Sequence, residues 1–197
     1  MNLKAALIRP LIDWRKLLVA SILTLLPPFN IMVPGYAIRT GLTFTEAPYQ
    51  LPPWKPIWPL FRDGLVAIGI IGILSLPCVI FITISQIVSR TAELPQYAYL
   101  VPPLYLIILS YIIPALMLLV FSRPVKVALA QLIPTILQPN YLLAMTTGYL
   151  VWILLSVAAT GISFLLAWTF IIPFVLLGAT TFVGTCLIMS LTRQTFK

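Results

Sequence analysis

Few of the chain's side chains have the chemistry that catalysis needs. Its 197 residues include no histidine, so the commonest general base is absent. The carboxylates are Asp13, Glu46, Asp63 and Glu93, and they are scattered along the sequence rather than paired. No serine stands in a nucleophile elbow, and no glycine-rich loop precedes a helix. Because an active site needs titratable or nucleophilic groups held together in a shielded place, we expect the protein not to be an enzyme.

The two cysteines are the remaining groups with metal or redox chemistry. Cys78 and Cys186 lie inside apolar stretches, and no C-x-x-C motif is present. Such cysteines usually behave as small buried hydrophobic residues. Without histidine, and with the carboxylates scattered, the sequence offers no set of metal ligands. We therefore expect neither a metal site nor a bound cofactor. The sequence offers no histidine ligand that would favour a pigment-binding role.

The composition decides what surrounds these residues. Sixty-one per cent of the residues are hydrophobic and 8% are charged, whereas about 25% of residues are charged in a typical soluble domain. Lipid rather than water must cover such a surface, so we predict an all-α integral membrane protein. The net charge of +8 is typical of Lys and Arg residues that flank membrane spans. No basic helix or basic–aromatic alternation is present, so we do not expect nucleic acid as a partner.

Uncharged stretches of sufficient length predict four transmembrane helices. About 20 helical residues cross a hydrocarbon core of about 30 Å. The uncharged stretch 141–190 is 50 residues long and must be divided, and Gly161 and Ser163 predict a tight turn within it. The four predicted spans are residues 64–86, 100–122, 141–160 and 163–190. None of them holds an ionisable residue, which disfavours proton- or ion-coupled transport.

The apolar segment 16–40 is interrupted by Pro27-Pro28 and by Asn30. Consecutive prolines remove two backbone donors and disfavour helix at the preceding residue. If the segment spanned the membrane, five basic residues would lie on one side and seven on the other. If it re-enters, Arg90 alone lies outside, and the inner side holds Lys4, Arg9, Arg15, Lys16, Arg39, Lys55, Arg62, Arg123, Lys126, Arg193 and Lys197. The positive-inside rule favours this second arrangement. We predict an N-terminal re-entrant hairpin of half-helices 16–26 and 30–40, with both termini cytoplasmic.

Two further segments are predicted to lie in the membrane interface. Residues 51–63 combine several prolines with Trp54 and Trp58, and tryptophan favours the headgroup level. Residues 125–138 follow Pro124 and alternate apolar and polar residues at roughly helical spacing, but they are too few to span. We expect both segments on the cytoplasmic face of a single membrane domain that covers residues 1–197.

The order of residues around the first apolar segments resembles a known family. The matching positions are Asp13-Trp14-Arg15-Lys16-Leu17, Gly35-Tyr36 with Arg39, Leu51-Pro52-Pro53-Trp54, Trp58, Leu60-Phe61, Asp63-Gly64 and Leu76-Pro77. In this order the chain is similar to the prokaryotic polytopic membrane proteins known as domain of unknown function 4013. The resemblance covers mainly residues 11–80, and more loosely residues 139–141. The double proline Pro27-Pro28 and the additional Pro56 and Pro59 depart from the family's pattern. The resemblance implies a helical domain in a prokaryotic membrane, either the cell inner membrane or an internal one, and it carries over no activity.

A small set of residues is predicted to make structural or partner contacts. Asp63 precedes a predicted span, where a carboxylate caps the first N–H groups, and Arg39 or Arg62 is expected to neutralise it. Gly69 and Gly72 belong with the small residues that allow close helix packing. The predicted interface or anchor residues are Trp54, Trp58, Arg39, Arg62, Asp63, Gly178 and Gly184.

These patterns favour a non-catalytic accessory, scaffolding or assembly subunit. We expect it to lie in the lipid bilayer and to pack against other proteins of a larger membrane complex. The alternative is a small-solute channel or transporter, because discontinuous helices occur at transporter binding sites and residues 27–30 interrupt a helix.

Overall fold

The computed structural model describes residues 2–88, 96–166, 169 and 171–196. Every regular element within these ranges is a helix, which confirms the predicted all-α class. Four helices there are long and apolar enough to cross a membrane, as predicted. They are α4 (Ile57–Val88), α5 (Val101–Ser122), α7 (Pro139–Leu165) and α8 (Ile171–Thr195). Arg90 and Glu93, expected on the outer side, lie outside the described residues, as does Lys197.

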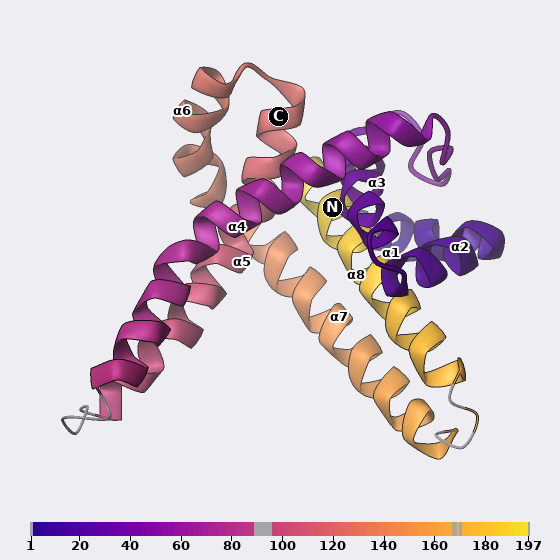
Figure 1. Ribbon diagram of the computed structural model, residues 1–197. Helices are drawn as coiled ribbons and strands as arrows, with labels where there is room; N and C mark the ends of the chain where they lie inside the picture. The colour runs from indigo at the N-terminus through magenta and orange to yellow at the C-terminus, as the bar shows by residue number, and fades with distance from the viewer. Residues whose placement is uncertain (1, 89–95, 167–168, 170, 197) are drawn as a thin grey trace.

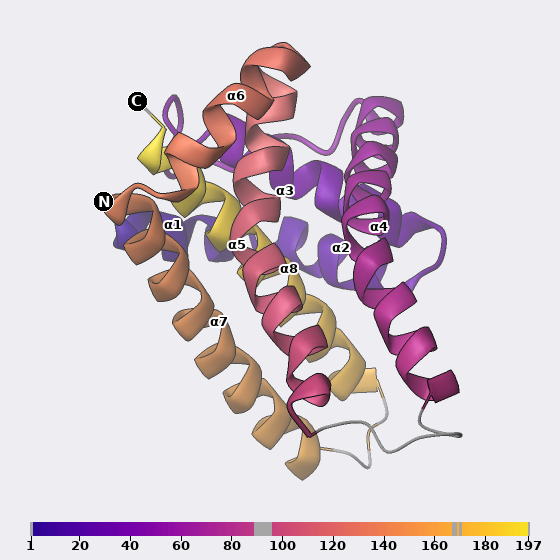
Figure 2. The ribbon, with the colours of Figure 1, turned by 90° about the vertical axis from the view of Figure 1, so that its left-hand side faces the viewer.

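The long helices form two pairs that diverge from one end of the molecule. In Figure 1, α4 and α5 run side by side to the lower left, and α7 and α8 run to the lower right. Figure 2 shows the C-terminal ends of α4 and α7 at the lower end, with α6 (Val125–Ile136) and both chain termini toward the upper end. The side chain of Gln194 accepts a hydrogen bond from the main-chain N–H of Asn2. Both termini therefore lie at the same end of the bundle.

Prolines are accommodated at helix starts and by donors from neighbouring helices. α5 and α7 carry proline in their first turn, where the missing N–H has no intrahelical partner to lose. Pro114, inside α5, removes the donor that would normally bond the carbonyl of Ser110. The hydroxyl of Tyr149 on α7 donates to that carbonyl at 2.6 Å. The expectation that a neighbouring helix satisfies a carbonyl freed by proline is confirmed at this position.

The hydroxyl groups of the long helices mostly bond back to their own backbone. The hydroxyls of Thr83, Thr147 and Thr160 donate to carbonyls four residues earlier at 2.8–2.9 Å. Thr181 and Thr185 on α8 do the same. Such bonds satisfy a hydroxyl in lipid without another helix. These hydroxyls are therefore already satisfied within the helices that carry them.

Two predicted boundaries are wrong. α7 continues through Gly161 and Ser163 to Leu165, so the turn predicted at 161–163 does not exist. A glycine costs a helix only about 1 kcal/mol, and the apolar residues around it favour continuation. α4 begins at Ile57 rather than at residue 64, so the second half of the predicted interfacial segment 51–63 is helical. Pro59 lies in the first turn of α4, where a helix tolerates proline.

The N-terminal third consists of short helices. Asp13 caps the second of them, its carboxylate accepting the main-chain N–H of Lys16 at 3.2 Å. The helical structure is interrupted at residues 26–28, where the two prolines predict an interruption. The half-helices predicted over 16–26 and 30–40 are thus present with slightly shifted bounds. The elements are α1 (Leu3–Ile12), α2 (Trp14–Leu25), the 3₁₀ turn η1 (Phe29–Ile31) and α3 (Met32–Leu42).

These short helices pack across α8 and the start of α4. The backbone of Ser21 on α2 lies directly against Gly178 of α8. Near the C-terminal end of α3, Gly41 lies beside the backbone of Met189 on α8. Residues of α8 belong to both hydrophobic clusters of the molecule, which makes α8 the central helix of the bundle. The N-terminal third therefore covers one side of α8.

Candidate functional site

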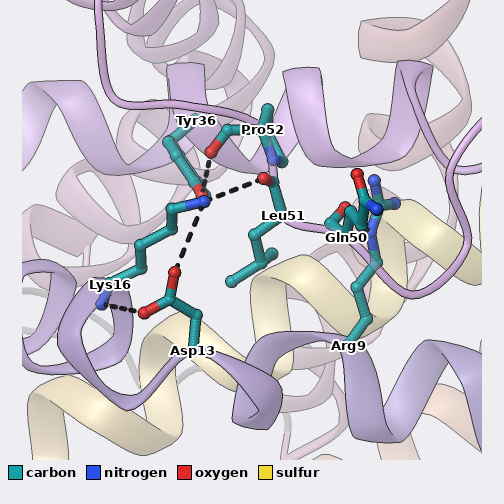
Figure 3. Close-up of polar contacts among 7 residues, drawn as sticks. All are labelled: Arg9, Asp13, Lys16, Tyr36, Gln50, Leu51 and Pro52. Carbon is teal, nitrogen blue, oxygen red and sulfur yellow. Dashed lines mark hydrogen bonds and ion pairs between the residues drawn. The ribbon is translucent and has the colours of Figure 1, made fainter.

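Three successive carbonyl groups of the irregular segment 43–56 each accept a hydrogen bond from a different helix. The bonds are 2.7 Å, 3.0 Å and 2.7 Å long. The donor–acceptor pairs are Arg9 Nε to Gln50, Lys16 Nζ to Leu51 and the Tyr36 hydroxyl to Pro52. Figure 3 shows these side chains converging on the segment from α1, α2 and α3. We call this group of six residues the carbonyl clamp.

Arg9, like Tyr36, is a fully buried member of the carbonyl clamp. It also donates to the carbonyl of Thr40 at 2.6 Å and to the hydroxyl of Thr43 at 2.9 Å. Its guanidinium lies 5.3 Å from the ring centre of Phe44. Burial lowers the pKa of Arg9, because water no longer stabilises its charge. No ion pair involves Arg9 among the described residues, so the carbonyls at the negative C-terminal end of α3 supply its electrostatic partner.

Lys16 and Tyr36 tie the same segment to α2 and α3. Lys16 Nζ lies 3.5 Å from a carboxylate oxygen of Asp13, which keeps the ammonium pointed toward Leu51. The hydrogen bond from the Lys16 main-chain N–H lowers the pKa of Asp13. Burial raises the pKa of the Tyr36 hydroxyl, so this group remains protonated and can donate to Pro52. The ion pair with Asp13 and the burial of Tyr36 therefore support the bonds to Leu51 and Pro52.

The two tryptophans that were predicted as anchors have different surroundings. Trp54 is half-buried and stacks on Tyr36, with ring centres 4.0 Å apart, while Phe182 of α8 lies 5.6 Å from Tyr36. The indole Nε1 of Trp54 is buried without a hydrogen-bond partner among the described residues. Trp58 is 75% exposed and stacks only on Phe61, at 5.8 Å. Trp54 therefore stabilises the interior of the chain, and the indole of Trp58 remains open to lipid or to a partner.

Asp63 joins α4 to α3 through Arg39 and is also contacted by Arg62 of its own helix. One of its oxygens is 3.2 Å from Arg39 Nη2, and the other is 3.4 Å from Arg62 Nη2. The predicted ion pair is confirmed with both candidate partners. The predicted cap is not, because Asp63 lies seven residues into α4 rather than at its start. Arg62 is 72% exposed and Arg39 only 23%, so Arg39 is the stronger partner.

The glycines differ in what lies against them. A Cβ at Gly178 would overlap the carbonyl oxygen of Ser21, and one at Gly184 would overlap the ring of Trp152. The prediction of close packing at these two glycines is confirmed, and both contacts lie within the chain. A Cβ at Gly69 or Gly72 on α4 would have no heavy atom of another residue within 4 Å. The close packing predicted for them does not occur within the chain.

The polar groups described above hold segments of the chain to one another. The polar atoms of the carbonyl clamp are directed at main-chain groups of the same chain, and Asp63 is neutralised by arginines. Among the described residues, no group of His, Cys, Asp or Glu is placed to hold a metal ion. What the site does chemically is to satisfy the main-chain carbonyls of an irregular segment. It thereby fixes the position of the N-terminal third.

Sequence reasoning missed the role of the carbonyl clamp. Arg9 was considered only as a charge that sets topology, Lys16 as such a charge and as part of a resemblance, and Tyr36 only as part of a resemblance. The donors and acceptors of the clamp are 16–41 residues apart in the sequence, so no local pattern pairs them. One signal was available, because an irregular proline-rich segment in a membrane protein must find donors for its carbonyls.

Scans of the chain against models of known families, against curated proteins and against solved structures found no match. The resemblance to domain of unknown function 4013 therefore stays a prediction that depends on the residues quoted for it. The function has to be argued from the chain's own geometry.

Alanine at the tightly packed glycines should destabilise the fold. A Cβ at Gly64 would overlap the carbonyl oxygen of Ile31, and neither backbone can move without the other. We expect Gly64→Ala and Gly178→Ala to lower the free energy of unfolding by about 1–3 kcal/mol each. Gly72→Ala is the matched control and should be neutral or stabilising by about 0.5–1 kcal/mol, since a Cβ there meets nothing. Denaturation in detergent micelles measures all three, and an equal effect at Gly64 and Gly72 would contradict the packing.

Proposed function

We propose that the chain is a non-catalytic membrane subunit with an accessory, scaffolding or assembly role. In this role it packs against another membrane protein through α4. The observation that supports the proposal most directly is the exposure of α4. In its most apolar stretch 11% of the residues are buried inside the chain, compared with 17% in α7 and 39% in α5 and in α8.

The exposed face of α4 has features of a helix-packing surface. Gly69 and Gly72 present bare backbone on this face, with no atom of another helix within 4 Å of either Cβ position, and we call these two positions the α4 depression. Small residues on membrane helices let a second helix approach closely, and van der Waals packing then drives association. Large apolar residues such as Ile73 and Leu76 stand beside them, 70% and 52% exposed. A partner helix would cover the depression and gain these contacts.

The chemistry of the long helices supports a packing role more than transport. The uncharged stretches of the sequence include residues 64–86, 100–122 and 141–190. Ionisable residues within spans mark most ion and proton pathways, and these stretches have none. Most of their described threonine hydroxyls bond to their own helix rather than pointing into a shared path. The alternative of a solute channel has no comparable feature in its favour.

The geometry of the N-terminal third supports a re-entrant hairpin. Arg9 precedes α2 and Thr40 lies at the end of α3, and the two are joined by a hydrogen bond of 2.6 Å. The segment between them reaches Gly178 of α8. Gly178 is 16 residues from Gln194 on the same helix, so the two residues are about 24 Å apart along the helix axis. In this proposal the chain enters and leaves on one side of the bilayer. Both termini, α6 and residues 51–56 then lie on the cytoplasmic side, where the positive-inside rule places most Lys and Arg residues.

Cysteine labelling from the two sides of the membrane tests the hairpin. Asn30 and Thr45 are both exposed, whereas the native Cys78 and Cys186 are buried. We expect Thr45→Cys to react with a membrane-impermeant maleimide only from the side that carries the termini, as Asn2→Cys does. We expect Asn30→Cys not to react from the outer side. Exclusive labelling of both Asn30→Cys and Thr45→Cys from the outer side would overturn the hairpin.

Filling the α4 depression tests the docking role. We expect the chain, purified from its native membrane in mild detergent, to migrate on native gels well above its 21.9 kDa mass. The double variant Gly69→Leu with Gly72→Leu should release it as a monomer, because leucine blocks the close approach. Gly161→Leu on α7 is the matched control, since Gly161 also has open space around it and should leave the assembly intact.

Two outcomes would count against the proposed function. If the wild-type chain migrates only as a monomer, and its removal leaves every membrane complex intact, the chain is not a subunit. If the purified protein carries small solutes across liposome membranes, the channel or transporter alternative is favoured. If the double leucine variant still migrates as part of an assembly, the contact with the partner lies elsewhere than on α4. The proposed role as a subunit would then remain.

A further inference from the structure

A polar cavity lies at the end of the bundle that carries both termini. It has a volume of about 170 Å³ and opens to the outside. The ends of α5 and α8, the helix α6 and the residue before α7 surround it. Its lining residues are Leu119, Arg123, Gln131, Pro134, Thr135, Gln138, Thr195 and Phe196. None of the described residues that line it is acidic.

Arg123 gives the cavity an uncompensated positive charge. Its side chain is half-buried, and it makes no ion pair or side-chain hydrogen bond with the described residues. Arg9, Lys16 and Arg39 all bond carbonyls or a carboxylate, whereas the half-buried Arg193, which does not line the cavity, has an Nε without a partner among the described residues. A guanidinium matches the geometry of phosphate oxygens and binds them with two parallel hydrogen bonds. An anion is therefore the ligand that Arg123 is suited to bind.

Two further features of the cavity fit an anion that also carries hydroxyl groups. Gln138 is the residue before α7, whose first turn has no side-chain cap, so the positive end of a long helix dipole adjoins the cavity. Gln131 lines the cavity, and its Oε1 is buried without a donor among the described residues. A hydroxyl of the ligand can supply that donor. Phosphate beside Arg123 and a hydroxyl beside Gln131 satisfy both groups.

The surroundings of the cavity favour a membrane lipid as the source of this chemistry. α6, which forms one wall, exposes a row of large apolar side chains to the surroundings: Val125, Leu129, Ile133 and Leu137 are 55–68% exposed. Such a helix at the bilayer interface lies beside acyl chains, with headgroups at the depth of its polar side. Basic pockets between membrane helices on the inner side bind anionic headgroups. Free phosphate would need none of this apolar surface.

We propose that the cavity between α5, α6 and α8 binds the headgroup of an anionic, hydroxyl-bearing phospholipid of the phosphatidylglycerol type. Arg123 holds the phosphodiester, and Gln131 accepts a hydrogen bond from a headgroup hydroxyl. The acyl chains extend around α6 to its apolar row, which lies on the face opposite Gln131 and Thr135. The site is separate from the carbonyl clamp and from the α4 depression.

Native mass spectrometry of delipidated protein in detergent tests this site. Phosphatidylglycerol, phosphatidylethanolamine and phosphatidylcholine with the same acyl chains serve as the probes. We expect phosphatidylglycerol to bind about tenfold more tightly than the other two, the size of one or two hydrogen bonds to a charged group. Arg123→Gln should remove that preference. Lys126→Gln, at an exposed lysine of α6 that does not line the cavity, should keep it within about twofold.

A second variant keeps the test decisive if Arg123→Gln fails to fold. Gln138→Glu keeps the size of the side chain and favours the start of α7, but it places a negative charge where the phosphate would bind. It should remove the phosphatidylglycerol preference while leaving thermal stability intact. Retained preference in both variants would overturn the site. Displacement of bound lipid by inorganic phosphate alone would overturn the lipid assignment and identify a free anion as the ligand.

Discussion

Main-chain carbonyls that lie outside regular helix and are shielded from water need donors from the protein itself. In this chain the need is concentrated at the end of α3 and in the irregular residues 43–56. It is met by side chains of α1, α2 and α3, with Arg9 contributing three hydrogen bonds on its own. Because each donor comes from a different helix, satisfying the segment also fixes the three helices relative to one another. The position of the whole N-terminal third follows from this.

Once the N-terminal third is fixed, the exposure of the other helices follows. α2 and α3 occupy one side of α8 and the start of α4, and they pack so closely that glycine is required at Gly64 and Gly178. α8 then becomes the interior helix, while α4 and α7 keep most of their apolar stretches, 89% and 83%, outside the chain. Asp63 is held between α3 and α4 by Arg39, which keeps its charge out of contact with lipid. The outward faces of α4 and α7 are what this packing leaves exposed.

The sequence alone predicts the features that depend on local composition. The four apolar helices, the break after Leu26 and the ion pair of Asp63 with Arg62 follow from residues close together in the chain, whereas the pair with Arg39, 24 residues away, was predicted from opposite charge alone. The boundary between α7 and α8 could not be placed, because Gly161 is compatible with helix and nothing charged marks the turn. Arg9 could not be assigned its role, since Thr40 and Gln50 lie 31 and 41 residues away. Tertiary contacts between short helices decide these points.

Hydrogen exchange in lipid nanodiscs tests most directly whether Arg9 holds the irregular segment. The amides of Thr43, Phe44, Ala47 and Gln50 are hydrogen-bonded to nearby carbonyls and should exchange slowly in the native chain. Arg9→Ala should raise their exchange rates by about tenfold or more, since two or more charge-assisted bonds are lost. Arg15→Ala, which removes an exposed arginine, should leave the rates unchanged. Slow exchange of these amides in Arg9→Ala, equal to that of the native chain, would contradict the central role of Arg9.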